Sequence, residues 1–120
     1  MEYISNKAGI SLQNQVFFKS PSLGLEAMQI QKYDKNVGEF KLHVDYECNF
    51  TAKKVRQLTY IWYLNDIVDG GETEFWANHR IKPTTGKLII FPSHWTYPHK
   101  GLVPKSDDKY IITGWLYQYY

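Results

Sequence analysis

The sequence predicts a mainly all-β domain, either a sandwich or a barrel, and three observations support this prediction. Short segments rich in β-branched and aromatic residues recur at intervals of roughly 8–15 residues. Gly, Pro and Asp, which favour turns, separate these segments. No stretch shows the periodicity of an amphipathic helix over a useful length. We therefore expect strands to form nearly all of the regular structure.

The expected elements follow one another in a simple order. Residues 1–24 hold several Ser, Asn and Gly residues, which predict a loosely structured lead-in with at most one short strand around 16–18. Six strands are expected after it, at 25–33, 39–47, 55–65, 72–76, 87–91 and 109–117. Turns or loops should join them at 34–38, 48–54, 69–71, 83–86 and 92–98. Residues 25–120 would then form a single domain.

The composition fits one globular domain and argues against several function classes. The chain has 120 residues, of which 43% are hydrophobic and 22% charged, so it is too apolar for a disordered chain. No run of about 18 apolar residues and no secretory signal is visible, so we expect no membrane partner and a cytoplasmic location. A net charge of +2 is too small to indicate nucleic-acid binding. The single cysteine, Cys48, excludes an internal disulfide and a cysteine-based zinc site.

Several of the expected strands carry polar residues on one face only. Side chains alternate between the two faces of a strand. On this basis the following groups each share a face: Gln29, Gln31 and Tyr33; His43 and Asp45; Gln57, Thr59 and Tyr63; Lys109 and Thr113. These faces could line a wet cavity, and a solvated outer face would give the same alternation.

His43 and Asp45 form the pattern that carries most chemistry. They lie two residues apart in the expected strand 39–47, so both should point to the same side, where an imidazole and a carboxylate can bind one cation. A surface ion pair is the alternative interpretation of so short a pattern. A metal site would need a further ligand from elsewhere in the chain.

The other histidines are His79, His94 and His99. His99 is the best candidate ligand, because the strand 109–117 that follows it can return beside the site. We expect His79 and His94 to lie in loops. Two histidines and one carboxylate leave about three of six octahedral positions open, which suits Fe(II) that binds a cosubstrate and dioxygen. A structural zinc site would instead be closed by four ligands.

Several ordered blocks of the chain resemble the Fe(II)/2-oxoglutarate-dependent dioxygenases, and within them the prolyl-4-hydroxylase-like branch. The blocks are Gln31-Lys32-Tyr33, His43-Val44-Asp45, Ile61-Trp62-Tyr63-Leu64-Asn65, Gly70-Gly71-Glu72-Thr73-Glu74-Phe75, Leu88-Ile89-Ile90-Phe91-Pro92, Pro98-His99 and Lys109-Tyr110-Ile111-Ile112-Thr113-Gly114-Trp115. Their shared order and spacing carry the resemblance over most of the chain. The resemblance implies a double-stranded β-helix, or jelly-roll, core with short or absent N-terminal helices.

The resemblance also implies the active-site residues. Three of them, His43, Asp45 and His99, would hold Fe(II) and be catalytic. Five others would surround the cosubstrate 2-oxoglutarate: Lys109, Tyr33, Tyr63, Thr113 and Trp115. Lys109 would pair with the distal carboxylate of 2-oxoglutarate, where many relatives carry Arg, and a buried dicarboxylate does need such a counter-charge. Tyr63 would donate its hydroxyl to the same carboxylate.

The implied reaction hydroxylates an unactivated C–H bond, expected in a prolyl residue of a peptide or protein, and decarboxylates 2-oxoglutarate to succinate and CO2. It requires Fe(II), 2-oxoglutarate and dioxygen, with ascorbate as a candidate stimulant. Relatives usually carry a longer helical N-terminal region than the roughly 24 residues here, so we expect a minimal or truncated member with short substrate loops. Three alternatives stay open: a hydroxylase of a free small molecule, a non-catalytic jelly-roll module that binds a metal or small molecule, and a cupin-like binder without iron.

Overall fold

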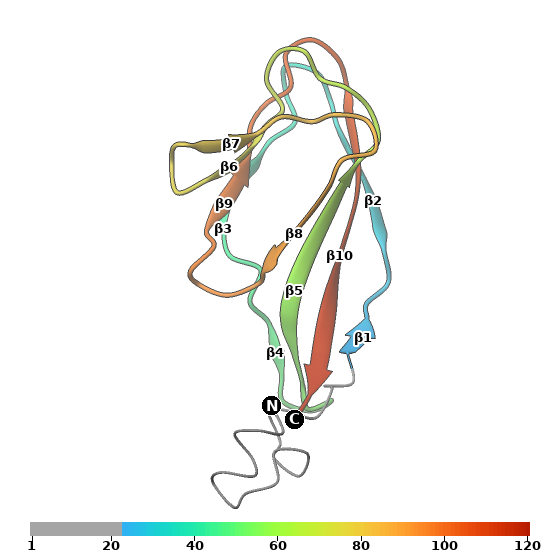
Figure 1. Cartoon of the computed structure of the whole chain (residues 1–120), viewed down its shortest axis with the longest axis vertical. Coiled ribbons are helices and arrows are strands. Elements are labelled where there is room, and N and C mark those ends of the chain that lie inside the picture. Colours follow the sequence, from blue (N-terminus) through green and yellow to red (C-terminus); the bar gives the residue numbers. More distant parts are fainter. Residues whose placement is uncertain (1–22) are drawn as a thin grey trace, which may run out of the picture.

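The computed structural model describes residues 23–120, which form ten β-strands in two antiparallel sheets (Figure 1). The large sheet contains β1 (Leu23–Leu25), β2 (Gln29–Tyr33), β4 (Cys48–Asn49), β5 (Lys54–Tyr63), β8 (Leu88–Pro92) and β10 (Lys109–Tyr119). The small sheet contains β3 (Phe40–His43), β6 (Thr73–Phe75), β7 (His79–Ile81) and β9 (His99–Gly101). Between residues 23 and 120 there is no helix long and apolar enough to cross a membrane.

The long strands β5 and β10 form the centre of the large sheet. β1 and β2 pair one after the other with the first edge of β10, and β5 pairs with its second edge. β8 and β4 pair with the remaining edge of β5. Both long strands are rich in β-branched and aromatic residues, which fit a pleated, half-buried surface. Because β5 and β10 have hydrogen-bonded neighbours on both sides, they give the interior a firmly held wall.

The small sheet faces this wall in the order β3-β9-β6-β7 (Figure 1). The core between the sheets is mostly aromatic and consists of Tyr33, Ile61, Tyr63, Phe75, Phe91 and Ile111. Phe75 of the small sheet meets Phe91 of the large sheet edge to face, with ring centroids 4.9 Å apart. Two antiparallel sheets packed in this way confirm the predicted all-β jelly roll.

The two faces of the large sheet differ in polarity. Thr59, Ile61 and Tyr63 of β5 are buried and point into the interior, whereas Trp62 is 45% exposed and Leu64 38% exposed on the outer face. The mixed face is therefore the inner one, and the apolar face is the outer one. The sequence left open whether the polar faces line a cavity or form a solvated outer surface. In the structure the polar face of β5 points inward.

The prediction of one continuous strand at 25–33 is wrong, because residues 26–28 separate β1 from β2. β1 pairs with the end of β10 and β2 with its beginning. In the gap, the backbone N–H of Glu26 donates to the carbonyl of Trp115, and the Glu26 carboxylate turns to Arg56 at 3.0 Å. The predicted lead-in lies outside the described residues except for its last two, which already belong to β1.

The expected strand 39–47 is also wrong, and this correction concerns the site. β3 ends at His43, and the chain then crosses from the small sheet to β4 in the large sheet. Asp45 lies in this crossing segment and not in a strand. Strand alternation therefore cannot be the reason why its side chain joins that of His43.

Further differences concern short strands and strand ends. β4, β7 and β9 were not predicted, because two or three residues are too few to show a period. His79 consequently lies in β7 and not in a loop. β5 ends at Tyr63, two residues earlier than expected, and β10 continues to Tyr119. The remaining predicted strands differ by about one residue at each end, as element boundaries commonly do.

The predicted turn at 69–71 is present and positions part of the interior. Gly70 and Gly71 have φ values of +76° and +74°, which a residue with a side chain adopts only with strain. Their turn leads into β6, and it directs the carbonyl of Gly71 to the ammonium of Lys109. The glycine pair thus helps to hold the side chain of Lys109, which lines the cavity described next.

Candidate active site

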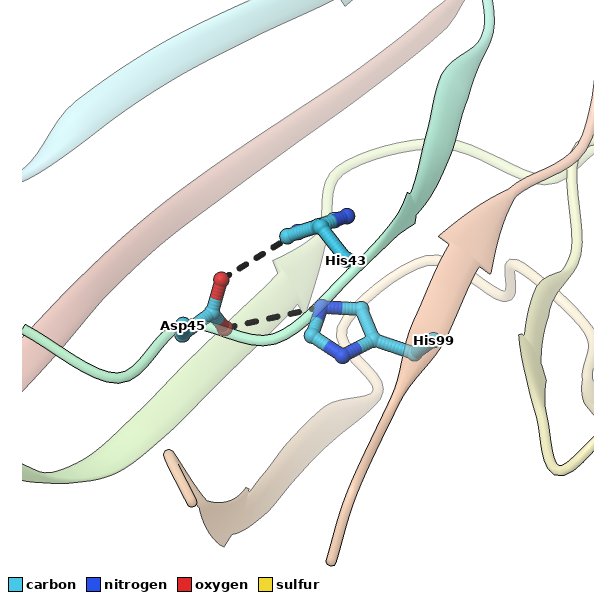
Figure 2. Close-up of side chains that lie close together, drawn as sticks. All are labelled: His43, Asp45 and His99. Atoms are coloured by element: carbon cyan, nitrogen blue, oxygen red, sulfur yellow. Dashed lines mark ion pairs between the residues drawn. The ribbon is translucent and has the colours of Figure 1, made fainter. Parts of the chain in front are cut away.

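His43, Asp45 and His99 form a cluster at the junction of the two sheets (Figure 2). His43 is the last residue of β3 and His99 the first of β9, and the two are cross-strand partners. Their rings lie 4.3 Å apart between centroids. One ligand-type atom from each of the three residues lies within 4.8 Å of the others. The register of β3 on β9 thus brings the histidines together, and the crossing segment adds the carboxylate.

Both imidazoles direct the same nitrogen toward Asp45. Nδ1 of His43 lies 2.7 Å from the carbonyl of Lys41, and Nδ1 of His99 lies 3.0 Å from that of Tyr97. Because a carbonyl only accepts, each Nδ1 carries the proton and donates it, which leaves Nε2 with its lone pair. These Nε2 atoms lie 3.2 and 3.5 Å from the two carboxylate oxygens of Asp45 (Figure 2). Two lone pairs and a carboxylate that converge on one point fit a divalent cation.

The protonation states support this interpretation. Burial lowers the pKa of His99, so this ligand is neutral at neutral pH. Burial also lowers the pKa of His43, but its hydrogen bonds with Asp45 and with the Lys41 carbonyl outweigh it, so the pKa is raised. Burial raises the pKa of Asp45, and the hydrogen bond from His43, the charge of His99 and the hydrogen bond from Thr59 together bring it below its ordinary value. The carboxylate of Asp45 is therefore ionised and available to a cation.

The carboxylate of Asp45 is held by residues that the sequence did not single out as part of the site. Thr59 of β5 donates its hydroxyl to Oδ2 of Asp45 at 2.8 Å. The hydroxyl of Ser93 lies 2.9 Å from that of Thr59. All three side chains are buried. Thr59 could have been found, because strand alternation places it on the inner face with Tyr63; Ser93 follows a strand end and gives no such signal.

A cavity of about 320 Å³ adjoins the cluster. Seven of the eight predicted site residues line it, namely Tyr33, His43, Asp45, His99, Lys109, Thr113 and Trp115. Tyr63 is the exception: it is fully buried, and its hydroxyl forms a hydrogen bond with Thr73, which does line the cavity. Burial raises the pKa of Tyr63 to about 12. The structure therefore presents the hydroxyl of Thr73 to the cavity, with Tyr63 behind it.

Lys109 supplies a buried positive charge to this cavity. It is 2% exposed, and its ammonium donates to the carbonyl of Gly71 at 2.9 Å. Burial lowers the pKa of Lys109 to about 8, against a smaller opposing effect of the charge of Glu72. An ammonium has three donors, and only one has an acceptor among residues 23–120. A carboxylate of a small ligand could accept the others.

Tyr33 and Thr113 lie on the same side of the cavity as Lys109. The hydroxyl of Tyr33 donates to the side-chain oxygen of Gln31 at 2.9 Å, and burial followed by the charge of Asp45 raises the pKa of Tyr33 to about 12. Thr113 donates its hydroxyl to the backbone carbonyl of Tyr60. Both tyrosine and threonine are thus neutral, hydrogen-bonded parts of the wall.

Arg56 also lines the cavity, whereas regular alternation along β5 would turn it to the outer face with Leu58. Its guanidinium lies 3.8 Å from the ring centre of Trp115 and forms ion pairs with Glu26 and Glu47. A β-bulge explains the difference: the β5–β10 register shifts between Leu116 and Tyr117, so Tyr117 pairs with Arg56. An extra residue in β5 at this point reverses the face on which Arg56 lies.

The other two histidines, His79 and His94, lie away from the cluster. His79 is an exposed residue of β7. Nε2 of His94 lies 3.1 Å from the side-chain oxygen of Gln57. Among residues 23–120, His43, Asp45 and His99 are the group whose ligand atoms could hold one ion.

Comparison with protein families and with solved structures gives matches over most of the chain. The family model described as the 2OG-Fe(II) oxygenase superfamily matches residues 28–117, which is 90 of the 120 residues. No curated protein sequence matches the chain significantly.

Three solved structures illustrate the structural similarity. A viral collagen prolyl hydroxylase from Paramecium bursaria Chlorella virus-1, determined as a 2-oxoglutarate complex, is 25% identical with a TM-score of 0.73, and the match covers 100% of this chain and 73% of that one. A prolyl-4-hydroxylase from Pseudomonas putida is 22% identical with a TM-score of 0.61, covering 98% and 64%. A prolyl hydroxylase from Trichoplax adhaerens, bound to a hypoxia-inducible-factor peptide fragment, is 21% identical with a TM-score of 0.65, covering 98% and 56%. All three share the fold of this chain.

Proposed function

Because the chain belongs to the 2OG-Fe(II) oxygenase superfamily and is thus a 2-oxoglutarate-dependent oxygenase, we propose that it hydroxylates a prolyl residue of a peptide or protein. The reaction would convert 2-oxoglutarate and dioxygen to succinate and CO2 as the substrate gains a hydroxyl group. One observation carries the proposal: the His43, Asp45 and His99 cluster opens into the same cavity as the buried ammonium of Lys109.

The three clustered residues would hold the iron. Both Nε2 atoms are free of protons in the tautomer that the backbone carbonyls impose, and Asp45 adds a negative charge. Three ligands on one side leave the other coordination positions to small molecules. Bound Fe(II) supplies the oxidising chemistry that places one oxygen atom of dioxygen on the substrate and the other in succinate.

Lys109 would bind and orient the cosubstrate. Its two unpaired donors can take a carboxylate of 2-oxoglutarate, with Thr73 and Thr113 as neighbours in the wall. The buried setting strengthens this pairing, because little water competes for either charge. Tyr33, beside both Lys109 and the cluster, would close the same end of the cavity.

The character of the cavity mouth supports a peptide substrate. Phe40, Val44 and Tyr46 line the cavity and are 43%, 40% and 55% exposed. Apolar side chains next to the metal ligands suit a pyrrolidine ring, and the Phe40 ring lies 4.1 Å from that of His43. The viral structural neighbour acts, by its name, on collagen prolyl residues, and this likeness also supports the proposal.

The proposal is tested by incubating the protein with Fe(II), 2-oxoglutarate and pools of proline-containing peptides. We expect succinate to form in proportion to a peptide mass gain of one oxygen atom, and both to vanish in His43→Ala. Succinate formation that depends on a free small molecule would overturn the peptide part. Binding of metal and 2-oxoglutarate with no succinate from any pool would instead identify a non-catalytic binding module.

A further inference from the structure

Two hydroxyl groups stand behind the carboxylate of Asp45. Thr59 and Ser93 are each 1% exposed. Thr59 lies in β5, and Ser93 is the residue that follows β8, the strand that pairs with β5. The backbone N–H of Ser93 donates to the carbonyl of Gln57, which fixes Ser93 against β5. The resulting line of atoms runs Ser93 Oγ, Thr59 Oγ1, Asp45 Oδ2, with spacings of 2.9 and 2.8 Å.

The direction of these hydrogen bonds follows from the number of protons. Asp45 is ionised and can only accept, so Thr59 must donate its single hydroxyl proton to Oδ2. Thr59 then has lone pairs left, and Ser93 donates to them. The two hydroxyls therefore form a relay with a single direction that ends on the carboxylate.

The relay also decides which oxygen of Asp45 is available. Oδ2 accepts the hydrogen bond from Thr59 and lies 3.5 Å from Nε2 of His99, whereas Oδ1 lies 3.2 Å from Nε2 of His43 and accepts from no hydroxyl among residues 23–120. Because Thr59 takes a lone pair of Oδ2 and fixes the orientation of the carboxylate, Oδ1 is the oxygen with both lone pairs left for an ion.

We propose that Ser93 and Thr59 are positioning residues that restrict Asp45 to coordinating the metal through Oδ1 alone, which keeps one more coordination position open for the cosubstrate and dioxygen. This inference rests on the proposed function, because it takes the His43, Asp45 and His99 cluster as the metal site. It assigns the two buried hydroxyls a role that packing alone does not require, since Val has the shape of Thr and would fill the same space.

The test measures Mn(II) binding calorimetrically in the protein without added metal. Thr59→Val removes the hydroxyl and keeps the shape, and we expect Mn(II) affinity to fall by roughly 10- to 100-fold, as for other groups that orient ligands. Thr59→Ser restores the hydroxyl and should restore most of the affinity. Ser93→Ala should weaken binding less than Thr59→Val does.

The chain offers a matched control on the same strand. Tyr60, next to Thr59, has a buried hydroxyl with no hydrogen-bond partner among the described residues, and it lies on the opposite face of β5. Tyr60→Phe therefore also deletes one buried hydroxyl, but it should leave Mn(II) affinity unchanged. Far-ultraviolet circular dichroism and thermal unfolding of each variant without metal would show that the fold is retained.

Two further measurements examine the relay and the single oxygen. If the hydroxyls act in series, the double variant Thr59→Val/Ser93→Ala should bind Mn(II) within about twofold of Thr59→Val, since coupled residues are not additive. At saturating Mn(II), Thr59→Val should also bind 2-oxoglutarate more weakly, because a freed Asp45 occupies two positions.

The outcomes separate the inference from the proposed function. If the wild-type protein fails to bind Mn(II), the metal site itself is wrong. If the wild type binds and folded Thr59→Val binds equally well, or Thr59→Ser is as weak as Thr59→Val, the positioning role is overturned. Additive losses in the double variant overturn the relay, and unchanged 2-oxoglutarate binding by Mn(II)-saturated Thr59→Val overturns the restriction to one oxygen.

Discussion

Lys109 and Tyr33 are cross-strand partners in the β2–β10 pair, and the ammonium of Lys109 lies 4.3 Å from the centre of the Tyr33 ring. The ring face offers partial negative charge, which compensates some of the cost of burying the ammonium. It cannot replace a carboxylate, and the lowered pKa of Lys109 shows that the compensation is incomplete. The ammonium of Lys109 thus has only part of the compensation that a buried charge needs, and a carboxylate ligand would supply the rest.

Removing the charge of Lys109 should weaken 2-oxoglutarate binding without lowering the stability of the ligand-free protein. In Lys109→Met, a side chain of similar length loses the two charge-assisted hydrogen bonds that the remaining donors of Lys109 would make to 2-oxoglutarate, each worth about 1.5–3 kcal/mol. We expect 2-oxoglutarate affinity of the Mn(II)-loaded protein to fall by roughly 100-fold or more, with Mn(II) affinity retained. The variant should be at least as stable as the wild type without ligand, because a buried charge has been removed. Calorimetry and urea unfolding measure both; wild-type 2-oxoglutarate affinity in this variant would rule out Lys109 as the cosubstrate anchor.

The same lysine predicts a pH dependence. Its pKa is about 8 in the folded protein and 10.5 when unperturbed. The carboxylate of 2-oxoglutarate needs the charged form, so affinity should be constant below pH 8 and decline above it by up to about tenfold per pH unit. Lys109→Met is the control, in which this decline should be absent. Titrations of the Mn(II)-loaded protein between pH 6.5 and 9 would measure it, and an equal decline in the variant would assign it to another group.

The sign for stability is opposite. Between about pH 8 and pH 10.5 the unfolded chain carries a proton on Lys109 that the folded chain has lost. The contribution of Lys109 to the free energy of unfolding therefore rises with pH across this window. In urea unfolding without ligand, the free energy of unfolding of the wild type minus that of Lys109→Met should increase as the pH rises. No change in their difference would show that Lys109 titrates normally in the folded state.

Metal and cosubstrate should stabilise the fold by binding the folded state alone. At a ligand concentration 100 times Kd, the free energy of unfolding rises by about 2.7 kcal/mol. Mn(II) together with 2-oxoglutarate should therefore raise the unfolding temperature of the wild type by several degrees, and a chelator should reverse the effect. His99→Ala should lose the increase, whereas His79→Ala, which changes an exposed histidine outside the cluster, should keep it. Equal stabilisation of both variants would mean that the metal binds elsewhere.

A close contact between the long strands predicts a structural variant. Gly114 of β10 pairs with Tyr60 of β5, and a Cβ at position 114 would collide with the Tyr60 hydroxyl and ring. Gly114→Ala should therefore destabilise the domain by about 1–3 kcal/mol in urea unfolding. The loss should shrink in a Tyr60→Leu background, since the colliding atoms are gone. An undiminished loss there would place the strain in the backbone of β10.

The sequence predicted those parts of the site that lie in long strands. Period-two alternation placed Lys109, Thr113 and Trp115 on one face of β10, and all three line the cavity. The same alternation failed for Arg56, because a β-bulge cannot be read from one sequence. It also failed for Tyr63, which shares its face with Thr59 but lies behind Thr73.

The metal cluster was predicted for a reason that is partly wrong. His43 and Asp45 do meet, but Asp45 lies beyond the end of β3 and is oriented by Thr59. His99 joins them through the short strand β9, which three residues could not reveal. The family resemblance supplied this set of residues, and only the tertiary structure supplies its physical cause.

The crossing segment between β3 and β4 has a mechanical consequence. His43 and His99 belong to the small sheet, whereas Asp45 is hydrogen-bonded to Thr59 of the large sheet. An ion bound by all three residues would therefore link the two sheets. The same segment is the place where the two sheets could separate when the ion leaves. Removal of the metal should then increase the rate of hydrogen–deuterium exchange in β3 and β9, while β5 and β10 stay protected. The enzyme would thus open locally, between the two sheets, and not unfold as a whole.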